Sequence, residues 1–147
     1  MSSPKRIVLG LGVGVVGLAW SLASDAAQAD VVAVVSTESP VTALGASEVA
    51  DIFLGKANHL PGGGVAVPID QAEGSPARDA FYDRFTGKSP AQLKAHWSKI
   101  VFTGQGHPPR EVANGIEAKK LVARNPNAIA YIDRAEVDAS VRVLDPP

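Results

Sequence analysis

The chain has 147 residues, no cysteine, and 14 basic against 15 acidic side chains, for a formal net charge of −1 at pH 7. The absence of cysteine excludes disulfides and thiolate metal sites. The balanced charge argues against nucleic acid as a partner, because nucleic-acid-binding domains carry a basic excess. The length suits one domain with its own hydrophobic core.

Residues 1–29 have the pattern of a secretory signal peptide. The positive pair Lys5-Arg6 precedes an apolar, glycine-rich stretch from Ile7 to Leu18, and Ala27-Gln28-Ala29 is a small-x-small cleavage signal. We expect cleavage after Ala29 and a periplasmic domain over 30–147. The alternative is an uncleaved anchor, although the apolar stretch is shorter than the ~20 residues that span a bilayer. With no second apolar run, we expect the mature form not to span the membrane.

The first half of the expected domain begins with a strand over Val31–Val35. This unbroken apolar run is typical of a strand buried on both faces, as in a parallel sheet covered by helices. A polar loop follows over Ser36–Pro40. Ser47 is a candidate N-cap for the next helix, whose buried stripe is predicted at Val49, Ile52 and Phe53, with Gly55 at its end.

A strand, loop and helix unit follows a glycine-rich loop over Lys56–Gly64. The strand is predicted at Val65, Val67 and Ile69, and the loop over Asp70–Gly74. Ser75 is a good N-cap and Pro76 suits the first helical position. Apolar residues recur every four positions on this helix, at Ala77, Phe81 and Phe85. Gly87 is expected to end the helix.

The last third is predicted to hold two helices and two strands. Ser89-Pro90-Ala91-Gln92 has the spacing of a capping box, and the helix that follows presents one apolar face; its members are Leu93, Trp97, Ile100 and Val101. Trp97 is interpreted as core, with a binding-surface aromatic as the alternative. After a loop over Thr103–Pro109, a helix is expected from Arg110 to Arg124 with Val112, Ile116 and Val122 inward. Strands are expected over Ala128–Ile132 and Ser140–Leu144, the latter at an edge with Arg142 facing water.

Alternating strands and helices predict an α/β fold, a single layered domain with a mainly parallel sheet flanked by helices. Ligands of such sheets lie outside the carboxyl ends of the strands. The loops expected there are Ser36–Pro40 and Asp70–Gly74, which Gly104–Pro109 could join. The helix start at Gly74 and Ser75 offers N–H groups and a positive dipole end, which suit an anion; an ordinary joint that binds nothing is the alternative.

The sequence offers little support for metal binding or catalysis. The chain has three histidines, His59, His96 and His107. None has a second histidine three or four residues away. Ser75 is not in a G-x-S-x-G elbow, because Ala77 stands where the second glycine belongs. We therefore expect neither an enzyme nor a cofactor.

Three stretches resemble the phosphate-binding-type periplasmic proteins, which are type 2 solute receptors of ABC importers. Val49–Lys56 is similar to their "ADIFLGK" helix end, and Val67–Phe81 to a strand followed by their "EGSGTRDAF" anion loop. Asn125–Ile132 is similar to their "tPGAIGYv" strand. The resemblance covers about Val31 to Leu144. It implies one lobe, the second, of a receptor whose anion lies between two lobes.

The resemblance also shows departures in the anion loop. Gln71 stands where the family usually has arginine, and Pro76 and Ala77 replace a glycine and a threonine that follow the serine. Proline has no N–H to donate, and alanine has no hydroxyl. Arg78 matches a helix residue that follows the family's ligand residues. The predicted ligand-binding set is Gly74, Ser75, Arg78, Gln71, Ser36 and Thr37.

The expected function is periplasmic binding of a small oxyanion, with phosphate as the first candidate, in connection with ABC transport. A permease or a second binding lobe is the expected protein partner. The alternative is an envelope interaction module that kept the fold and lost the anion site. Ser75 could equally be a plain cap, and Arg78 could instead pair locally with Asp79 or Asp83.

Overall fold

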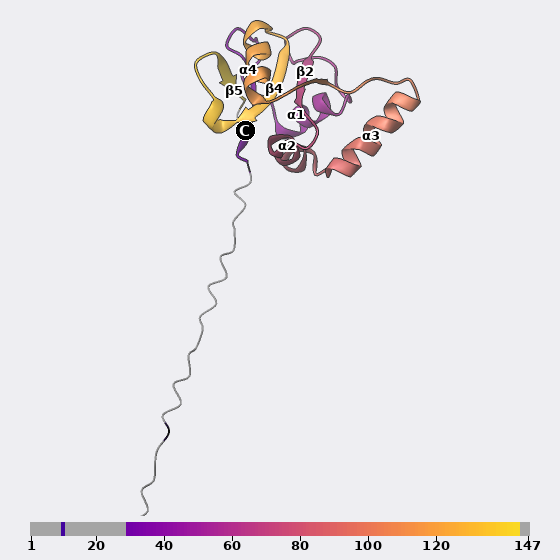
Figure 1. Cartoon of the computed structure of the whole chain (residues 1–147). Coiled ribbons are helices and arrows are strands. Elements are labelled where there is room, and N and C mark those ends of the chain that lie inside the picture. Colours follow the sequence, from indigo (N-terminus) through magenta and orange to yellow (C-terminus); the bar gives the residue numbers. More distant parts are fainter. Residues whose placement is uncertain (1–9, 11–28, 145–147) are drawn as a thin grey trace, which may run out of the picture.

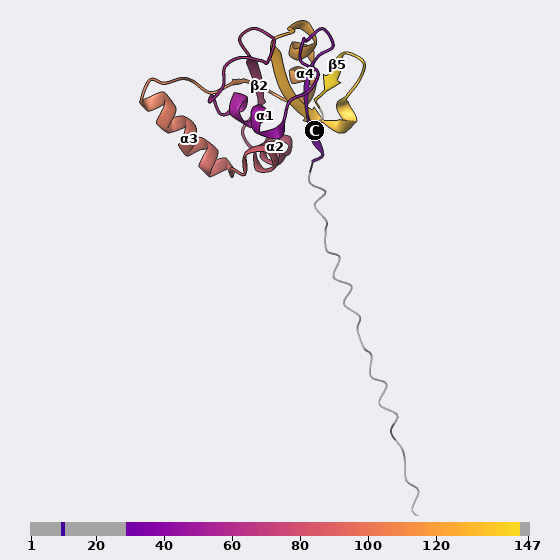
Figure 2. The same ribbon diagram turned by 180° about the vertical axis from the view of Figure 1, so that it is seen from behind.

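The computed structural model describes residues 10 and 29–144. Apart from Gly10 and Ala29, the predicted signal peptide lies outside the described residues. The domain is a sheet with helices on both faces (Figures 1 and 2). Its elements in chain order are β1 (Val31–Ser36), α1 (Ala46–Phe53), β2 (Val67–Gln71), α2 (Pro76–Thr86), α3 (Pro90–Phe102), β3 (Arg110–Val112), α4 (Gly115–Arg124), β4 (Ala128–Asp133), a 3-10 turn (Arg134–Glu136) and β5 (Val141–Val143).

The sheet has the strand order β3-β2-β4-β1-β5. β2 pairs in parallel with both β3 and β4, whereas β1 pairs antiparallel with both β4 and β5. Four strands therefore run in one direction and β1 runs against them. The predicted α/β fold with a mainly parallel sheet is confirmed, but the parallel setting expected for β1 is wrong. Burial on both faces of a strand says nothing about its direction.

β1 contributes side chains to both layers of the core. Val31, Ala33 and Val35 pack among residues of α1 and α2, while Val32 and Val34 pack with residues of α4 on the other face. All six residues of β1 are buried. This alternation is what a central strand covered on both sides requires.

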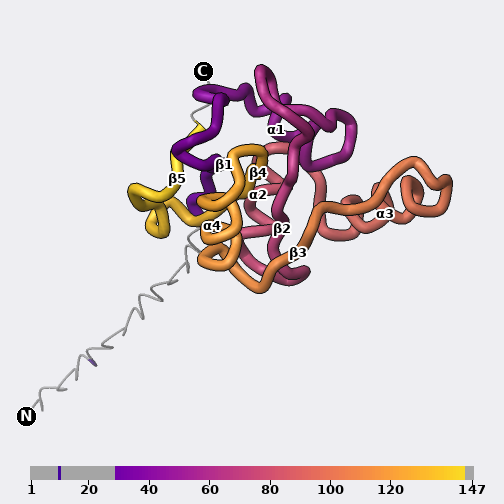
Figure 3. Tube along the Cα trace, turned by 90° about the horizontal axis from the view of Figure 1, so that it is seen from above, coloured from indigo at the N-terminus to yellow at the C-terminus, as the bar shows by residue number. Residues whose placement is uncertain are grey.

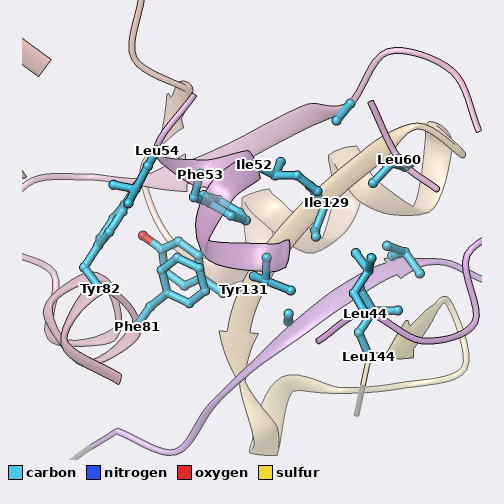
Figure 4. Close-up of a cluster of buried hydrophobic side chains, with 14 of the residues drawn as sticks. Leu44, Ile52, Phe53, Leu54, Leu60, Phe81, Tyr82, Ile129, Tyr131 and Leu144 are labelled. Carbon is cyan, nitrogen blue, oxygen red and sulfur yellow. The ribbon is translucent and has the colours of Figure 1, made fainter. Parts of the chain in front are cut away.

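Aromatic rings fill the layer between α1, α2 and the sheet (Figure 4). Phe81 of α2 stacks on Tyr131 of β4 with ring centroids 4.1 Å apart and planes within 7°. Phe53 of α1 meets Phe81 edge-on at 4.7 Å. Phe53, Phe81 and Tyr131 are fully buried, so this cluster joins two helices to the centre of the sheet.

The start of α1 and both ends of β2 differ from the predicted positions. α1 is capped by Gly45 rather than Ser47, because the Glu48 carboxylate accepts a hydrogen bond from the Gly45 N–H at 2.7 Å. β2 begins at Val67, and Val65 is 61% exposed. The strand also runs two residues further than expected, through Gln71. The sequence suggested a loop there because its polar side chains break the apolar run.

The largest local error concerns Arg110–Val112, expected as the start of a helix. These residues form β3, and Asn114 caps α4, its side chain accepting a hydrogen bond from the Glu117 N–H at 3.0 Å. Val122 is buried as expected, but Ile116 is 50% exposed. Pairing with β2 provides hydrogen bonds to a segment whose own sequence carries no strong strand signal.

α2 and α3 begin as the sequence predicts. Ser75 and Ser89 are the caps, each followed by proline, and Gly87 ends α2 in the left-handed conformation. α3 extends away from the sheet (Figure 3). Its Leu93 and Trp97 are buried, which confirms the core interpretation of Trp97, but Val101 is 53% exposed.

At the far edge of the sheet, β5 confirms the expected edge strand but not the solvent-facing Arg142. The guanidinium donates to the carbonyls of Thr37, Ser39 and Val41, at 2.6 to 3.2 Å. Arg142 therefore fixes the loop that follows β1. Within the described part of the chain, no helix is both long and apolar enough to cross a membrane.

The aromatic cluster predicts the cost of truncating its central ring. Phe81→Ala should lower the free energy of unfolding by about 3–5 kcal/mol through lost burial and the cavity left behind. Phe102→Ala is the matched control, because Phe102 is 92% exposed and its loss should cost less than about 0.5 kcal/mol. Urea denaturation measures both, and similar losses in the two variants would contradict this account of the core.

Candidate functional site

β2 ends in a buried carboxylate. Asp70 is 3% exposed and accepts hydrogen bonds from two tyrosine hydroxyls. Tyr82 of α2 donates to Oδ2 at 2.7 Å, and Tyr131 of β4 donates to Oδ1. A buried charge is tolerated only when it is paired and hydrogen-bonded. Asp70 therefore joins the end of β2 to the middle of α2 and of β4.

This buried environment shifts the pKa values of both tyrosines strongly. Burial raises the pKa of Tyr82 and of Tyr131 well above the ordinary value of 10.0, and the charge of Asp70 with its hydrogen bonds raises both further. Both hydroxyls hence stay protonated and act as donors to Asp70. The network therefore holds α2 and β4 against the end of β2.

Arg78, on the first turn of α2, is the cation of this region. Its Nε lies 3.5 Å from Asp70 Oδ1, and the side chain is 16% exposed. Burial lowers the pKa of Arg78, but the charge of Asp70, with smaller contributions from neighbouring groups, raises it above its usual value. The guanidinium is thus held charged. Its ion pair is with Asp70, so the expected local pairing with Asp79 or Asp83 is wrong.

The guanidinium of Arg78 keeps unused donors. Its Nε is buried without a hydrogen-bond partner among the described residues. An unsatisfied buried donor costs about 1–3 kcal/mol. Because Arg78 also carries two terminal nitrogens in a fork suited to oxyanions, it can serve a ligand that approaches from the adjoining cavity.

That cavity has a volume of about 300 Å³ and lies between α3, the loop after β2, the first turn of α2 and β3. We call it the α3 cavity. Its charged lining residues are Arg78, Lys94, Glu73 and Glu111, and its remaining lining residues are Pro90, Leu93, Trp97, Ser98, Val101 and Pro108. Pro108 comes from the loop that was expected to join the site. The sequence placed none of the α3 residues there.

Gln71 and Ser75 are engaged with the protein. The Gln71 side-chain amide donates to the Tyr131 carbonyl at 2.9 Å, and its Oε1 accepts from the Ser75 hydroxyl at 3.3 Å. The Ser75 Oγ also accepts from the Arg78 N–H at 3.4 Å. Gln71 is 2% exposed. The structure thus brings Gln71, Ser75 and Arg78 together, with Gln71 positioning Ser75.

The start of α2 offers fewer donors than an unobstructed helix end. The Ser75 N–H is bonded to the Ala72 carbonyl at 3.0 Å, Pro76 has no N–H, and the Arg78 N–H is used by the cap. Of the four groups left free at a helix start, that of Ala77 remains. Gly74 adopts a φ of +87°, which turns the chain from β2 into the helix.

Ser36 and Thr37 lie away from this group. Because β1 is antiparallel to β4, the Gln71 end of β2 lies level with Val32, four residues before Ser36. At about 3.3 Å per residue the two positions are separated by roughly 13 Å along the strand direction. The expectation that the loop after β1 meets the loop after β2 is therefore wrong.

The buried network itself is what sequence reasoning missed. The apolar pattern predicts Asp70 in a loop and assigns no role to Tyr82 or Tyr131. Polar residues at the end of an apolar strand, with two tyrosines in later elements, were the available signal. No cluster of three or more metal-ligating side chains occurs within the described residues.

Solved structures similar to this chain include three phosphate transport proteins. A putative phosphate ABC transporter substrate-binding protein from Clostridium perfringens, with bound phosphate, is 26% identical with a TM-score of 0.63, over 79% of this chain and 44% of that one. An ABC-type phosphate transport receptor from Vibrio cholerae is 20% identical with a TM-score of 0.61, over 79% and 45%. PstS from Borrelia burgdorferi is 14% identical with a TM-score of 0.58, over 79% and 46%.

No family model and no curated protein matches the chain. The structural matches show that the chain has the fold of phosphate-binding-type periplasmic binding proteins. It spans less than half the length of those structures, which fits the predicted single lobe.

The raised tyrosine pKa values predict a loss of stability in alkali. Above pH about 10, tyrosines of the unfolded chain ionise while Tyr82 and Tyr131 in the folded chain stay protonated. The folded state then binds more protons, so stability falls with rising pH by up to about 1.4 kcal/mol per pH unit for each tyrosine. Tyr82→Phe should also lose about 1.5–3 kcal/mol at neutral pH with its hydrogen bond to a charged group.

Urea denaturation at several pH values between 8 and about 11 measures this dependence. Stability of the Tyr82→Phe variant should fall less steeply above pH about 10 than that of the wild type. Comparing the two slopes removes the contribution of lysines, which both proteins share. Equal slopes would contradict the protonated, Asp70-bound state of Tyr82.

Proposed function

Starting from the fold of phosphate-binding-type periplasmic binding proteins, we propose that this chain is a non-catalytic, one-lobed domain that binds a small oxyanion. Phosphate is the first candidate, because one solved structure of this fold is described as holding it. The setting is the periplasm and the process is ABC import. The proposed mature domain spans 30–147, after removal of a signal peptide at Ala29.

Arg78 carries this proposal. A largely buried guanidinium has its charge maintained by Asp70, lacks a hydrogen-bond partner at Nε among the described residues, and borders a cavity. Arginine is the side chain best suited to oxyanions because its planar fork can donate two parallel hydrogen bonds. At the same helix start, the Ala77 N–H can add a donor, and the Ser75 hydroxyl can add another by turning its proton from Gln71 Oε1 to the anion. The positive end of the helix dipole adds charge.

The surroundings of Arg78 also weaken the expected binding of a small anion. The negative charge of Asp70 cancels part of the field of Arg78, and Pro76 and Ala77 supply fewer donors than a glycine and a threonine would. A single lobe also leaves one side of the ligand in water. The proposed partner is therefore a second lobe or a transporter component that covers this side.

The position of Asp30 supports the proposed domain start. Its carboxylate accepts from Arg134 Nε at 2.9 Å and lies 3.8 Å from Arg84 Nη1, and its carbonyl accepts from the Arg134 N–H at 2.8 Å. These contacts attach residue 30 to the folded body next to α2 and β4. Cleavage after Ala29 would leave them intact.

Thermal melts of residues 30–147 with millimolar phosphate test the proposal. Binding to the folded state alone should raise the midpoint, equivalent to about 2.7 kcal/mol at ~100 times the dissociation constant. Arg78→Gln should remove the phosphate-dependent rise, and Ser75→Ala should reduce it. Each variant is compared with and without phosphate, because breaking the pair with Asp70 also lowers the starting midpoint.

Arg124→Gln is the matched control, since Arg124 is an exposed arginine in the last turn of α4 and distant from Asp70 in the fold. It should keep the full phosphate response. Sulfate separates oxyanion binding from phosphate selectivity, and chloride at equal ionic strength accounts for screening. A rise that persists unchanged in Arg78→Gln would remove Arg78 from the site.

A further inference from the structure

The α3 cavity is larger and more apolar than an inorganic anion needs. Its volume of about 300 Å³ lies at the lower end of the range occupied by organic ligands. Leu93, Trp97 and Val101 form a continuous side on α3, and Pro90 and Pro108 extend the apolar wall. Inorganic phosphate beside Arg78 would leave the exposed part of this wall, at Pro90, Val101 and Pro108, in contact with water.

The charges in the cavity also disfavour a free anion. Arg78 and Lys94 are opposed by Glu73 and Glu111, so the four ionisable lining groups sum to zero. Glu111 lies close enough to Arg78 to raise its pKa, although less than Asp70 does. A doubly charged inorganic anion therefore gains little from the net field, and tight binding needs contacts of another kind.

Two residues that line the same cavity carry unsatisfied donors. Within the described part of the chain, the buried side-chain nitrogens and oxygens without a hydrogen-bond partner are Arg78 Nε and Trp97 Nε1. Both atoms are donors, and both residues line the α3 cavity. Trp97 is 7% exposed. Both nitrogens are enclosed by protein, and an oxygen of a ligand would reach them after a small shift of the side chains.

We infer that the oxyanion of the proposed function is the head group of a small organic phosphate, whose apolar body lies in the α3 cavity. The phosphate group binds at Arg78, next to the start of α2. The apolar body packs against Leu93, Trp97 and Val101. This inference rests on the proposed function, since it names the class of ligand taken by the same arginine.

Isothermal titration of residues 30–147 compares phenyl phosphate with inorganic phosphate, and phenol serves as the probe without an anion. Phenyl phosphate should bind at least about tenfold more tightly than inorganic phosphate, because ring burial adds apolar contact. Phenol should bind more weakly than phenyl phosphate. Arg78→Gln should weaken phenyl phosphate binding by at least about tenfold, which links head group and body in one site.

Val101→Ser tests the apolar wall without removing a core residue, because Val101 is 53% exposed. It should reduce the preference for phenyl phosphate over inorganic phosphate to about threefold or less, and leave the affinity for inorganic phosphate unchanged. Ile116→Ser is the matched control on α4, since Ile116 is 50% exposed and does not line the cavity. It should keep the full preference.

The outcomes separate the two proposals. Equal binding of phenyl phosphate and inorganic phosphate, both dependent on Arg78, would overturn the organic ligand and leave oxyanion binding in place. A preference that survives in Val101→Ser would overturn the placement of the ring in the α3 cavity, because the ring would then lie elsewhere. If neither phosphate binds, the proposed function fails and the inference fails with it.

Discussion

The need to satisfy one buried carboxylate organises this end of the molecule. Asp70 is enclosed at the end of β2, where an unpaired charge would be strongly unfavourable. Tyr82 from α2 and Tyr131 from β4 donate to it, and Arg78 lies beside it. The positions of α2 and β4 relative to β2 are thereby fixed by polar contacts, while the rings of the same tyrosines enter the aromatic core.

This arrangement determines what the candidate site can do. Asp70 keeps Arg78 charged and holds its guanidinium beside the α3 cavity. It also reduces the electrostatic attraction that a free anion would feel. The protein thus combines a fixed donor with a weak field, and the apolar wall of α3 is the part of the surroundings that can add binding energy.

Gln71 and Pro76, which depart from the anion loop that the sequence resembles, also leave the start of α2 with few free donors. The side chain of Gln71 lies between the Tyr131 carbonyl and Ser75, so it holds the serine in place. Pro76 starts α2 well but contributes no donor. The positive charge of the site is instead provided one turn later by Arg78. A likeness in fold to phosphate transport proteins therefore coexists with a helix start that has few free donors.

The sequence alone determined the features that depend on neighbouring residues. Caps at Ser75 and Ser89, the glycine end of α2 and the burial of β1 follow from local hydrogen bonding and short apolar patterns, which a chain carries wherever it is placed.

Tertiary structure decided the direction of β1, which places Ser36 and Thr37 at the opposite end of the strands from Gln71. It made Arg110–Val112 a strand. It also joined Asp70 to Tyr131, 61 residues away, and Arg78 to the wall of α3. Strand pairing and the burial of a charge depend on partners distant in sequence, so no local pattern could specify them.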